Sequence, residues 1–288
     1  MSGSTPLPPG SADEPLTPPR SRGSHVWWWL LVGVGAIALV FLLVAEPWSP
    51  VETEPSPTAS MSPAPTTPSP TPTPSVSVAP PGANAMFDAL TAPGLFVTTA
   101  DLVADVPAAE SGVEPRILTG QLAWGLPVGS TIEPTACTIA ATVVATPPLW
   151  YDARSWANDA LDFQQEVTLL VDPAAARQAF RELVTTVDAC PEYRQINPGL
   201  DGASWTAQPA IEGQGVYPSI VLQQTHTAEG VAVPGYVGHM LVGNTIVTWT
   251  ASALSTGDPD AALSTLGDPT SLSAMVQKRA QLAVRALG

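Results

Sequence analysis

The chain has 288 residues and a formal net charge of −15, from 25 acidic and 10 basic side chains. Nucleic-acid binding rests mainly on Lys and Arg side chains that neutralise phosphates, so this charge argues against a nucleic-acid partner. Prolines are unevenly distributed, because 18 of the 33 lie within the first 82 residues. The remaining chain, about 205 residues, is long enough for one sizeable hydrophobic core.

Residues 26–45 form a run of twenty residues without a charge, VWWWLLVGVGAIALVFLLVA. At 1.5 Å per helical residue the run spans about 30 Å, the thickness of the hydrocarbon core of a bilayer. Tryptophans begin the run and Trp48 follows it, as is typical of side chains at the two membrane interfaces. A buried core helix rarely stays apolar on all faces over this length. The run therefore predicts a single transmembrane helix.

The charges on either side of this run predict its orientation. Arg20 and Arg22 precede it, whereas three glutamates follow it between residues 46 and 54. Because positively charged flanks stay in the cytoplasm, the N-terminus is predicted to be cytoplasmic and the C-terminal part extracytoplasmic. Residues 1–25, rich in Pro, Ser and Gly, are predicted to be a disordered cytoplasmic tail.

A cleavable signal peptide is the alternative interpretation of the same run. Cleavage after Ala45 would place Leu43 where a small residue is preferred, and Pro47 lies just beyond. A lipid anchor would need a cysteine near the run, and the first cysteine of the chain is Cys137. We therefore expect an uncleaved, single-pass protein of the cell membrane.

Residues 46–82 are rich in Pro, Ser and Thr, with 12 prolines from Pro47 onward. This composition favours polyproline II conformation over packing into a core. At roughly 3.1 Å per residue, such a segment reaches on the order of 110 Å when fully extended. We predict an extracytoplasmic linker, which is either a plain spacer or an O-glycosylated stalk.

The segment 83–288 carries the patterns of a folded domain. Two short helices are predicted first, near residues 84–90 and over 100–106, and Thr98 or Thr99 would cap the second.

A strand and a helix are predicted next in the chain. The strand covers residues 163–171 and is rich in β-branched side chains. Asp172 and Pro173 then supply an N-cap and a first-turn proline for a helix that runs to about residue 188. Apolar residues recur along this helix every three or four positions, so one face is predicted to pack on a sheet.

Three strands are predicted towards the C-terminus, over residues 217–227, 235–243 and 243–252. The Gly243-Asn244 step marks a tight hairpin between the last two. A terminal helix follows Asp268-Pro269. Antiparallel strands with helices between and after them predict an α+β fold, an antiparallel sheet flanked by helices.

Cys137 and Cys190 are the only cysteines, and both lie in the segment predicted to be exported. A single pair in an oxidising compartment indicates a disulfide, and two free buried thiols are the alternative. Closing a loop of 52 intervening residues stabilises a fold by roughly 4 kcal/mol in the loop-closure model.

Candidate ligand-binding residues lie between positions 147 and 163, where aromatic and charged side chains alternate. Trp150, Tyr151 and Trp156 supply rings, and Arg154 between them could orient a carboxylate or a phosphate. The alternatives are that the rings cover the sheet and that Arg154 forms a structural salt bridge.

No other residues point to catalysis or to a cofactor. His226 and His239 fall on separate predicted strands, so no metal site is expected. No G-x-S-x-G motif occurs for a serine hydrolase. Asp159 and Asp162 are three residues apart and are expected to be solvated charges on a short helix or turn. We therefore expect a non-enzymatic protein without a cofactor or metal.

Six short motifs carry a resemblance to a known family. They are TTADL from Thr98, PTAC up to Cys137, FQQEVTLL, DPAAARQAFRELV, ACPEY around Cys190, and VGNTIVTWTAS. Over most of residues 86–287 the sequence resembles the actinobacterial PknH-like extracellular sensor domains. The resemblance implies an antiparallel sheet flanked by helices, disulfide bracing and a groove for an envelope ligand. The kinases of that family carry an inner catalytic domain and two disulfides, whereas one disulfide and a short cytoplasmic tail are predicted for this chain.

Two classes of function follow from the sequence. The first is a non-catalytic, sensor-like domain that binds an envelope small molecule, glycan or protein. The second is a structural or assembly tether of the cell envelope, and an envelope hydrolase ranks third. An exposed aromatic cleft would favour the binding domain, and a flat polar surface would favour the tether.

Overall fold

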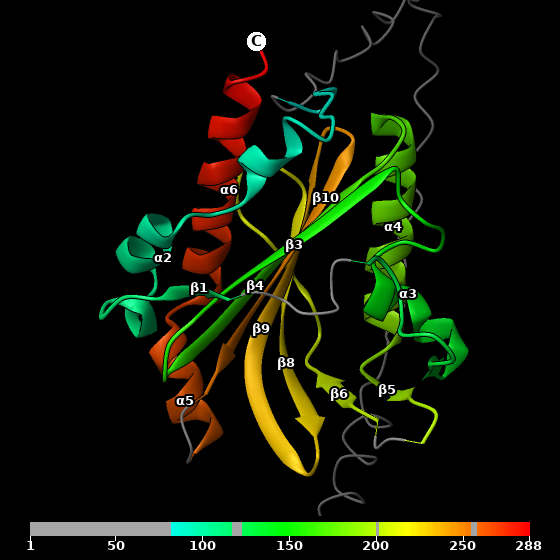
Figure 1. The fold of residues 1–288 in the computed structure, drawn as a ribbon, viewed down its shortest axis with the longest axis vertical. Helices are drawn as coiled ribbons and strands as arrows, with labels where there is room; N and C mark the ends of the chain where they lie inside the picture. Colours follow the sequence, from blue (N-terminus) through cyan, green and yellow to red (C-terminus); the bar gives the residue numbers. More distant parts are fainter. Residues whose placement is uncertain (1–81, 117–122, 200–201, 255–257) are drawn as a thin grey trace, which may run out of the picture. The chain divides into compact units, whose positions relative to one another are not determined.

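The structure, a computed structural model, describes four ranges of the chain (Figure 1): 82–116, 123–199, 202–254 and 258–288. The predicted cytoplasmic tail, the predicted span at 26–45 and the predicted linker up to residue 81 lie outside these ranges. Within them, no helix combines the length and the apolar character needed to cross a membrane.

The described strands pair into one antiparallel sheet. Their bounds are β1 (Glu114–Arg116), β2 (Thr131–Glu133), β3 (Trp150–Ala157), β4 (Leu161–Leu169), β5 (Glu192–Ile196), β6 (Ser204–Ala207), β7 (Ile211–Glu212), β8 (Ser219–Ala228), β9 (Val231–Val242) and β10 (Thr245–Ala253). The strand order is β1-β3-β4-β10-β9-β8-β6-β5-β2, with β7 paired to β8. Long strands that follow one another in the chain, such as β3 and β4 or β8, β9 and β10, are neighbours in this sheet.

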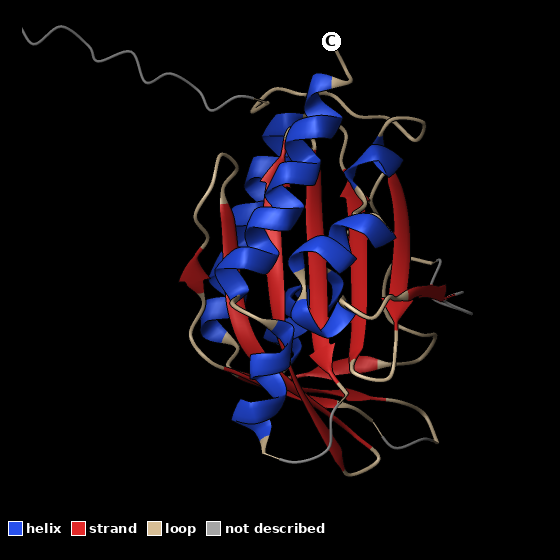
Figure 2. Cartoon of the chain, turned by 90° about the vertical axis from the view of Figure 1, so that its left-hand side faces the viewer, coloured by secondary structure: helices blue, strands red, loops and turns tan. Residues whose placement is uncertain are grey.

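Helices cover both faces of the sheet. The α-helices are α2 (Thr99–Asp105), α3 (Thr138–Thr142), α4 (Pro173–Ala189), α5 (Pro259–Leu266) and α6 (Pro269–Arg285), and the short 3-10 helices are η1 (Ala92–Leu95), η2 (Pro107–Ala109) and η3 (Thr135–Cys137). Figures 1 and 2 show α6 on one face of the sheet and α4 on the other. We call these the α6 face and the α4 face. The predicted α+β class, with an antiparallel sheet flanked by helices, is confirmed.

Side chains alternate between the two faces along each strand, and each face has its own apolar core. On β10, Val247 and Trp249 point to the α6 face, whereas Ile246 points to the α4 face. The Trp249 ring lies across Gly238 of β9, where an added Cβ would come within 2.2 Å of the indole. Only glycine at this position leaves room for the largest side chain of the core.

Local capping signals are confirmed where the sequence predicted them. Asp172 accepts a hydrogen bond from the backbone N–H of Ala175 at 2.8 Å and begins α4. Thr98 caps α2 in a reciprocal arrangement with Asp101. The hairpin between β9 and β10 turns at Gly243, which has a φ of +57° and no room for a side chain against the Ala85 carbonyl. The caps and the turn itself depend on residues close together in the chain, whereas the contact of Gly243 with Ala85 does not.

The helix predicted near residues 84–90 is wrong. The Asp88 carboxylate accepts hydrogen bonds from the backbone N–H groups of Leu90 and Thr91, which fixes a turn instead of a helix. The Asn244 side chain also bonds the backbone of Phe87 in both directions, at 2.8 and 3.1 Å. A distant hairpin therefore determines the conformation of this segment.

Several elements lie where the sequence indicated none, among them β3 and α5. The aromatic stretch that begins at Trp150 is strand β3, and α5 precedes the predicted terminal helix α6. Asp162 lies on strand β4, so the prediction of a short helix or turn is wrong for this residue, whereas Asp159 lies in the turn between β3 and β4.

Candidate ligand-binding surface

The four predicted ligand-binding residues all lie on strand β3, and strand geometry separates them. Trp150, Arg154 and Trp156 point to the α6 face, and Tyr151 points to the α4 face. The four side chains therefore do not meet on one surface.

Trp156 belongs to the hydrophobic core. Its side chain is only 5% exposed, and its ring centroid lies 6.1 Å from that of Phe163. Phe163 in turn stacks on Trp249 with a centroid separation of 6.3 Å. Trp156 therefore occupies the position given by the alternative interpretation, in which the aromatic rings cover the sheet and do not form a binding site.

Arg154 and Trp150 remain together on the accessible part of the α6 face. The Arg154 guanidinium carbon lies 4.3 Å from the centroid of the Phe96 ring, which is a cation–π arrangement. Its Nε lies 3.7 Å from the carboxylate of Asp152, and 45% of the arginine side chain is exposed. Trp150 is partly buried and packs against the edge of the core. Two of the predicted residues thus share the accessible part of the α6 face, and Asp152 lies between them along the strand.

Tyr151 belongs to a polar row that crosses the α4 face. Its hydroxyl faces Glu166 of β4, and burial raises the pKa of both groups. Cross-strand pairing continues the row from Glu166 to Thr248 of β10 and His239 of β9. The His239 Nδ1 lies 2.9 Å from the Thr248 hydroxyl, and complete burial lowers the pKa of this imidazole to about 4. At neutral pH the histidine is therefore uncharged.

We expect the burial of His239 to make the fold sensitive to acid. Its pKa falls from 6.5 to about 4 on folding, so between these pH values the unfolded chain binds more protons than the folded chain. The stability that neutral His239 contributes is complete above pH 6.5 and is lost as the pH falls towards 4, by about 3 kcal/mol. Urea unfolding at pH 7.0 and pH 4.5 measures the loss.

The variant His239→Gln separates this effect from the titration of carboxylates. Its stability is expected to fall less than that of the wild type between the two pH values, because the carboxylates are common to both proteins. Glu166, whose pKa is raised, acts with the opposite sign in both. An equal pH dependence of the two proteins would contradict the role of His239.

A row of stacked rings lies elsewhere on the α4 face, and the sequence analysis did not detect it. Trp205 stands between Tyr193 and His226, with centroid separations of 5.1 and 5.2 Å and nearly parallel planes. Because neighbours cover both faces of the indole, the row presents ring edges outward. The three residues come from β5, β6 and β8, and only the cross-strand register brings them together.

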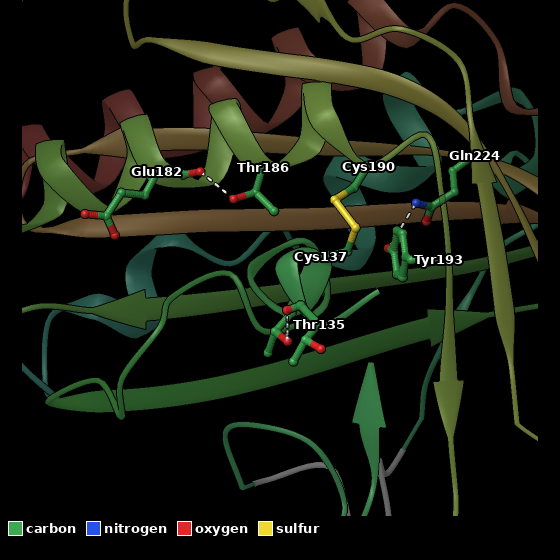
Figure 3. The surroundings of a disulfide bond; sticks show 8 residues. Thr135, Cys137, Glu182, Thr186, Cys190, Tyr193 and Gln224 are labelled. Carbon is green, nitrogen blue, oxygen red and sulfur yellow. Dashed lines mark hydrogen bonds between the residues drawn. A yellow bond between two sulfur atoms is a disulfide. The ribbon is translucent and has the colours of Figure 1, made fainter. Parts of the chain in front are cut away.

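The predicted disulfide between Cys137 and Cys190 is confirmed. It joins η3 to the end of α4, with a Cα–Cα separation of 5.7 Å (Figure 3). Beside it, the Gln224 amide donates a hydrogen bond to the Tyr193 hydroxyl at 3.3 Å. The two cysteines and Tyr193 form one buried cluster against which Trp205 packs, so the row is part of the fold.

The remaining chemistry-bearing residues do not assemble into a metal-binding cluster within the described ranges. His226 stacks on Trp205, and His239 is buried in the polar row. Both histidines therefore contact groups of the fold.

Two open depressions are among those on the described surface, and none of the four predicted residues lines either. The larger, about 350 Å³, lies between α2 and α6 and is lined by Ala104, Asp105, Ser271, Ala274, Met275 and Lys278. The smaller, about 250 Å³, is lined by Gln208, Pro209, Ile211, Val221, Leu222, Gln223, Tyr236 and Pro269. Trp150 and Arg154 therefore lie outside these two depressions.

Comparison with known proteins identifies a distant likeness in structure. No protein-family model matches the chain, and no curated protein matches its sequence. The chain is similar to the extracellular domain of PknH from Mycobacterium tuberculosis, with 12% identity and a TM-score of 0.46, over 71% of this chain and 98% of that one. It is also similar to a putative uncharacterized protein from Mycobacterium smegmatis, the Rv0999 ortholog, with 16% identity and a TM-score of 0.31, over 58% of this chain and 86% of that one. Neither likeness identifies a ligand, and the surface is interpreted from its own residues.

Proposed function

We propose that residues 83–288 form a non-catalytic, extracytoplasmic domain that binds an envelope ligand or partner. In this proposal residues 26–45 anchor the chain in the cell membrane, with the N-terminus in the cytoplasm and 46–82 as the linker. The disulfide supports the location, because disulfides persist in oxidising compartments outside the cytoplasm. The charges that flank the apolar run support the orientation.

The exposed guanidinium of Arg154 is the observation that carries the binding function. Phe96 supports the flat face of the guanidinium, and Asp152 lies beside its Nε, so the group is held in place before a ligand arrives. A guanidinium recognises a carboxylate or a phosphate through paired N–H donors. Preorganisation of this kind lowers the entropy cost of binding.

The neighbouring side chains define the ligand class further. Trp150 offers a partly buried ring for an apolar or ring-shaped portion of the ligand. Asp152 disfavours a ligand of high negative charge, and so does the domain as a whole, with 20 acidic against 8 basic residues from position 83 onward. The proposed ligand carries one carboxylate or phosphate next to an apolar group.

Binding of the purified full chain to isolated cell-envelope fragments tests this function. Arg154→Ala is expected to weaken co-sedimentation at least tenfold, because a hydrogen bond to a charged group contributes about 1.5–3 kcal/mol. Arg154→Lys keeps the charge but loses the paired donors, so its binding should lie between that of the wild type and that of Arg154→Ala. Trp150→Leu should also weaken binding.

Arg116→Ala is the matched control. Arg116 lies on the neighbouring strand β1, is 56% exposed and pairs with Asp162 at 3.6 Å. Binding that depends on net charge alone would fall equally in Arg116→Ala and Arg154→Ala, and that result would contradict the proposed site. Envelope binding unchanged in every variant would favour the tether over the binding domain.

A further inference from the structure

Four exposed aliphatic residues lie on segments that meet at one end of the sheet. Met86, Leu90, Leu149 and Val171 are 54%, 89%, 71% and 67% exposed, and we call these four residues the apical patch. Single exposed aliphatic residues are ordinary, whereas a group from separate loops indicates a contact surface.

The hairpin residue Asn244 links the segments that carry the patch. Its backbone N–H donates to Ala85, and its side-chain amide donates to the carbonyls of Phe87 and Leu170. Met86 lies between the first two of these residues, and Val171 follows the third. The hydrogen bonds of Asn244 therefore hold together the segments that carry Met86 and Val171.

Leu149 joins the same end through the edge of β4. Its backbone N–H donates to the Leu169 carbonyl at 2.9 Å, so it lies beside the end of β4 that leads to Val171. Trp150 follows Leu149 directly, and its ring packs against the edge of the α6-face core.

The chain enters the described domain at this end. The described part begins at Gly82, four residues before Met86. A Cβ on Gly82 would lie 3.1 Å from the Tyr217 ring and 3.2 Å from Val284, so the backbone here runs close to both side chains. Figure 1 shows the segment that follows Gly82, the tip of the β9–β10 hairpin, the start of α4 and the C-terminus at the same end of the sheet. Whatever precedes Gly82 in the chain is therefore tethered next to the apical patch.

Two carboxylates border the patch, and both are held by local hydrogen bonds, which lower the pKa of Asp88. The Asp88 carboxylate accepts hydrogen bonds from Leu90 and Thr91, and the Asp172 carboxylate caps α4. Arg177 donates to the carbonyl of Ala83 at 3.1 Å. This surface has no cluster of lysines or arginines among its described residues that would attract anionic lipids.

We propose that the apical patch contacts the surface of the lipid bilayer, so that the domain lies with this end against the membrane. This inference rests on the membrane anchor proposed above. The linker keeps the patch within on the order of 110 Å of the bilayer, so the contact is intramolecular and needs only modest affinity. The contact is apolar, and uncharged phosphatidylcholine is sufficient for it.

Fluorescence quenching in nanodiscs tests the contact. The full chain is reconstituted into phosphatidylcholine nanodiscs that contain lipids with a nitroxide near the headgroup. Leu90→Cys and Leu149→Cys each receive a fluorophore at a site that is already exposed. We expect quenching of at least half of the fluorescence at both positions. Replacing one fifth of the lipid by an anionic lipid should not increase it.

Val231→Cys is the matched control, because Val231 is 63% exposed and lies at the β8–β9 turn, at the other end of these strands. Its label should not be quenched. Adding Met86→Asp and Val171→Asp to the Leu149→Cys chain should abolish quenching there, since it places two further carboxylates within the patch itself. Equal quenching at Val231 and Leu149, or none at either position of the patch, would overturn the inference.

Three further outcomes identify which proposal fails. A chain that does not co-elute with the nanodiscs would contradict the membrane anchor, and with it the inference. A chain that co-elutes but has an unquenched patch would contradict the inference alone. Self-quenching between labels on two chains would assign the patch to a second copy of this protein and would also overturn it.

Discussion

Replacing Cys190 with alanine is expected to lower the free energy of unfolding by about 4 kcal/mol, because the bridge closes a long loop of the unfolded chain. It joins Cys137 to Cys190 across a sequence separation of 53, so much conformational entropy returns when the bond is lost. Domains of this size have a free energy of unfolding of about 5–15 kcal/mol, so the loss is a large share of the total. Urea unfolding of wild type and variant measures it.

The double variant Cys137→Ser, Cys190→Ser is the control for a stray thiol in the single variant. Its free energy of unfolding should equal that of the wild-type protein measured in the presence of a reductant. Alkylation of the unreduced, denatured wild type should label neither cysteine. A melting temperature unchanged by Cys190→Ala would contradict the role of the bridge in stability.

Trp156→Ala is expected to cost about 3–5 kcal/mol, the range for a core aromatic residue replaced by alanine. The Trp156 ring is 5% exposed and packs on Phe163, so truncation leaves a cavity between the sheet and the α6-face core. Trp150→Ala should cost clearly less, because Trp150 is only partly buried at the edge of that core. Urea unfolding of both variants measures the difference.

This comparison also decides how binding data on these tryptophans are interpreted. Loss of envelope binding in Trp156→Ala would follow from a damaged core, whereas loss in Trp150→Leu with an unchanged unfolding transition would indicate contact with the ligand. A cost below about 1 kcal/mol for Trp156→Ala would contradict its place in the core.

The candidate surface was only partly predictable from the sequence. Trp150, Tyr151, Arg154 and Trp156 were grouped because they are close in the chain, but strand geometry sends Tyr151 to the opposite face. The residues that support Arg154 illustrate the same limit. Phe96 lies 58 positions before it in the chain, and only the packing of the η1 segment on the sheet places that ring under the guanidinium.

Features with a local physical cause were determined by the sequence alone. Asp172-Pro173 begins α4 because a carboxylate cap and a fixed proline φ act within one turn. Gly243-Asn244 forms a tight hairpin because glycine adopts positive φ at no steric cost. With two cysteines in the chain, only one intramolecular pairing was possible.

Features that depend on distant residues were decided only by the tertiary structure. Asn244 overrides the helix predicted near residues 84–90, from 157 positions away. Trp205 and His226 stack because β6 and β8 pair in one register, which no periodicity of either segment reveals. The apical patch arises in the same way, from loops that strand pairing brings to one end of the sheet. Capping and turn chemistry act over a few residues and can be read along the chain, whereas strand order and register follow from the burial of the whole sheet between its helices.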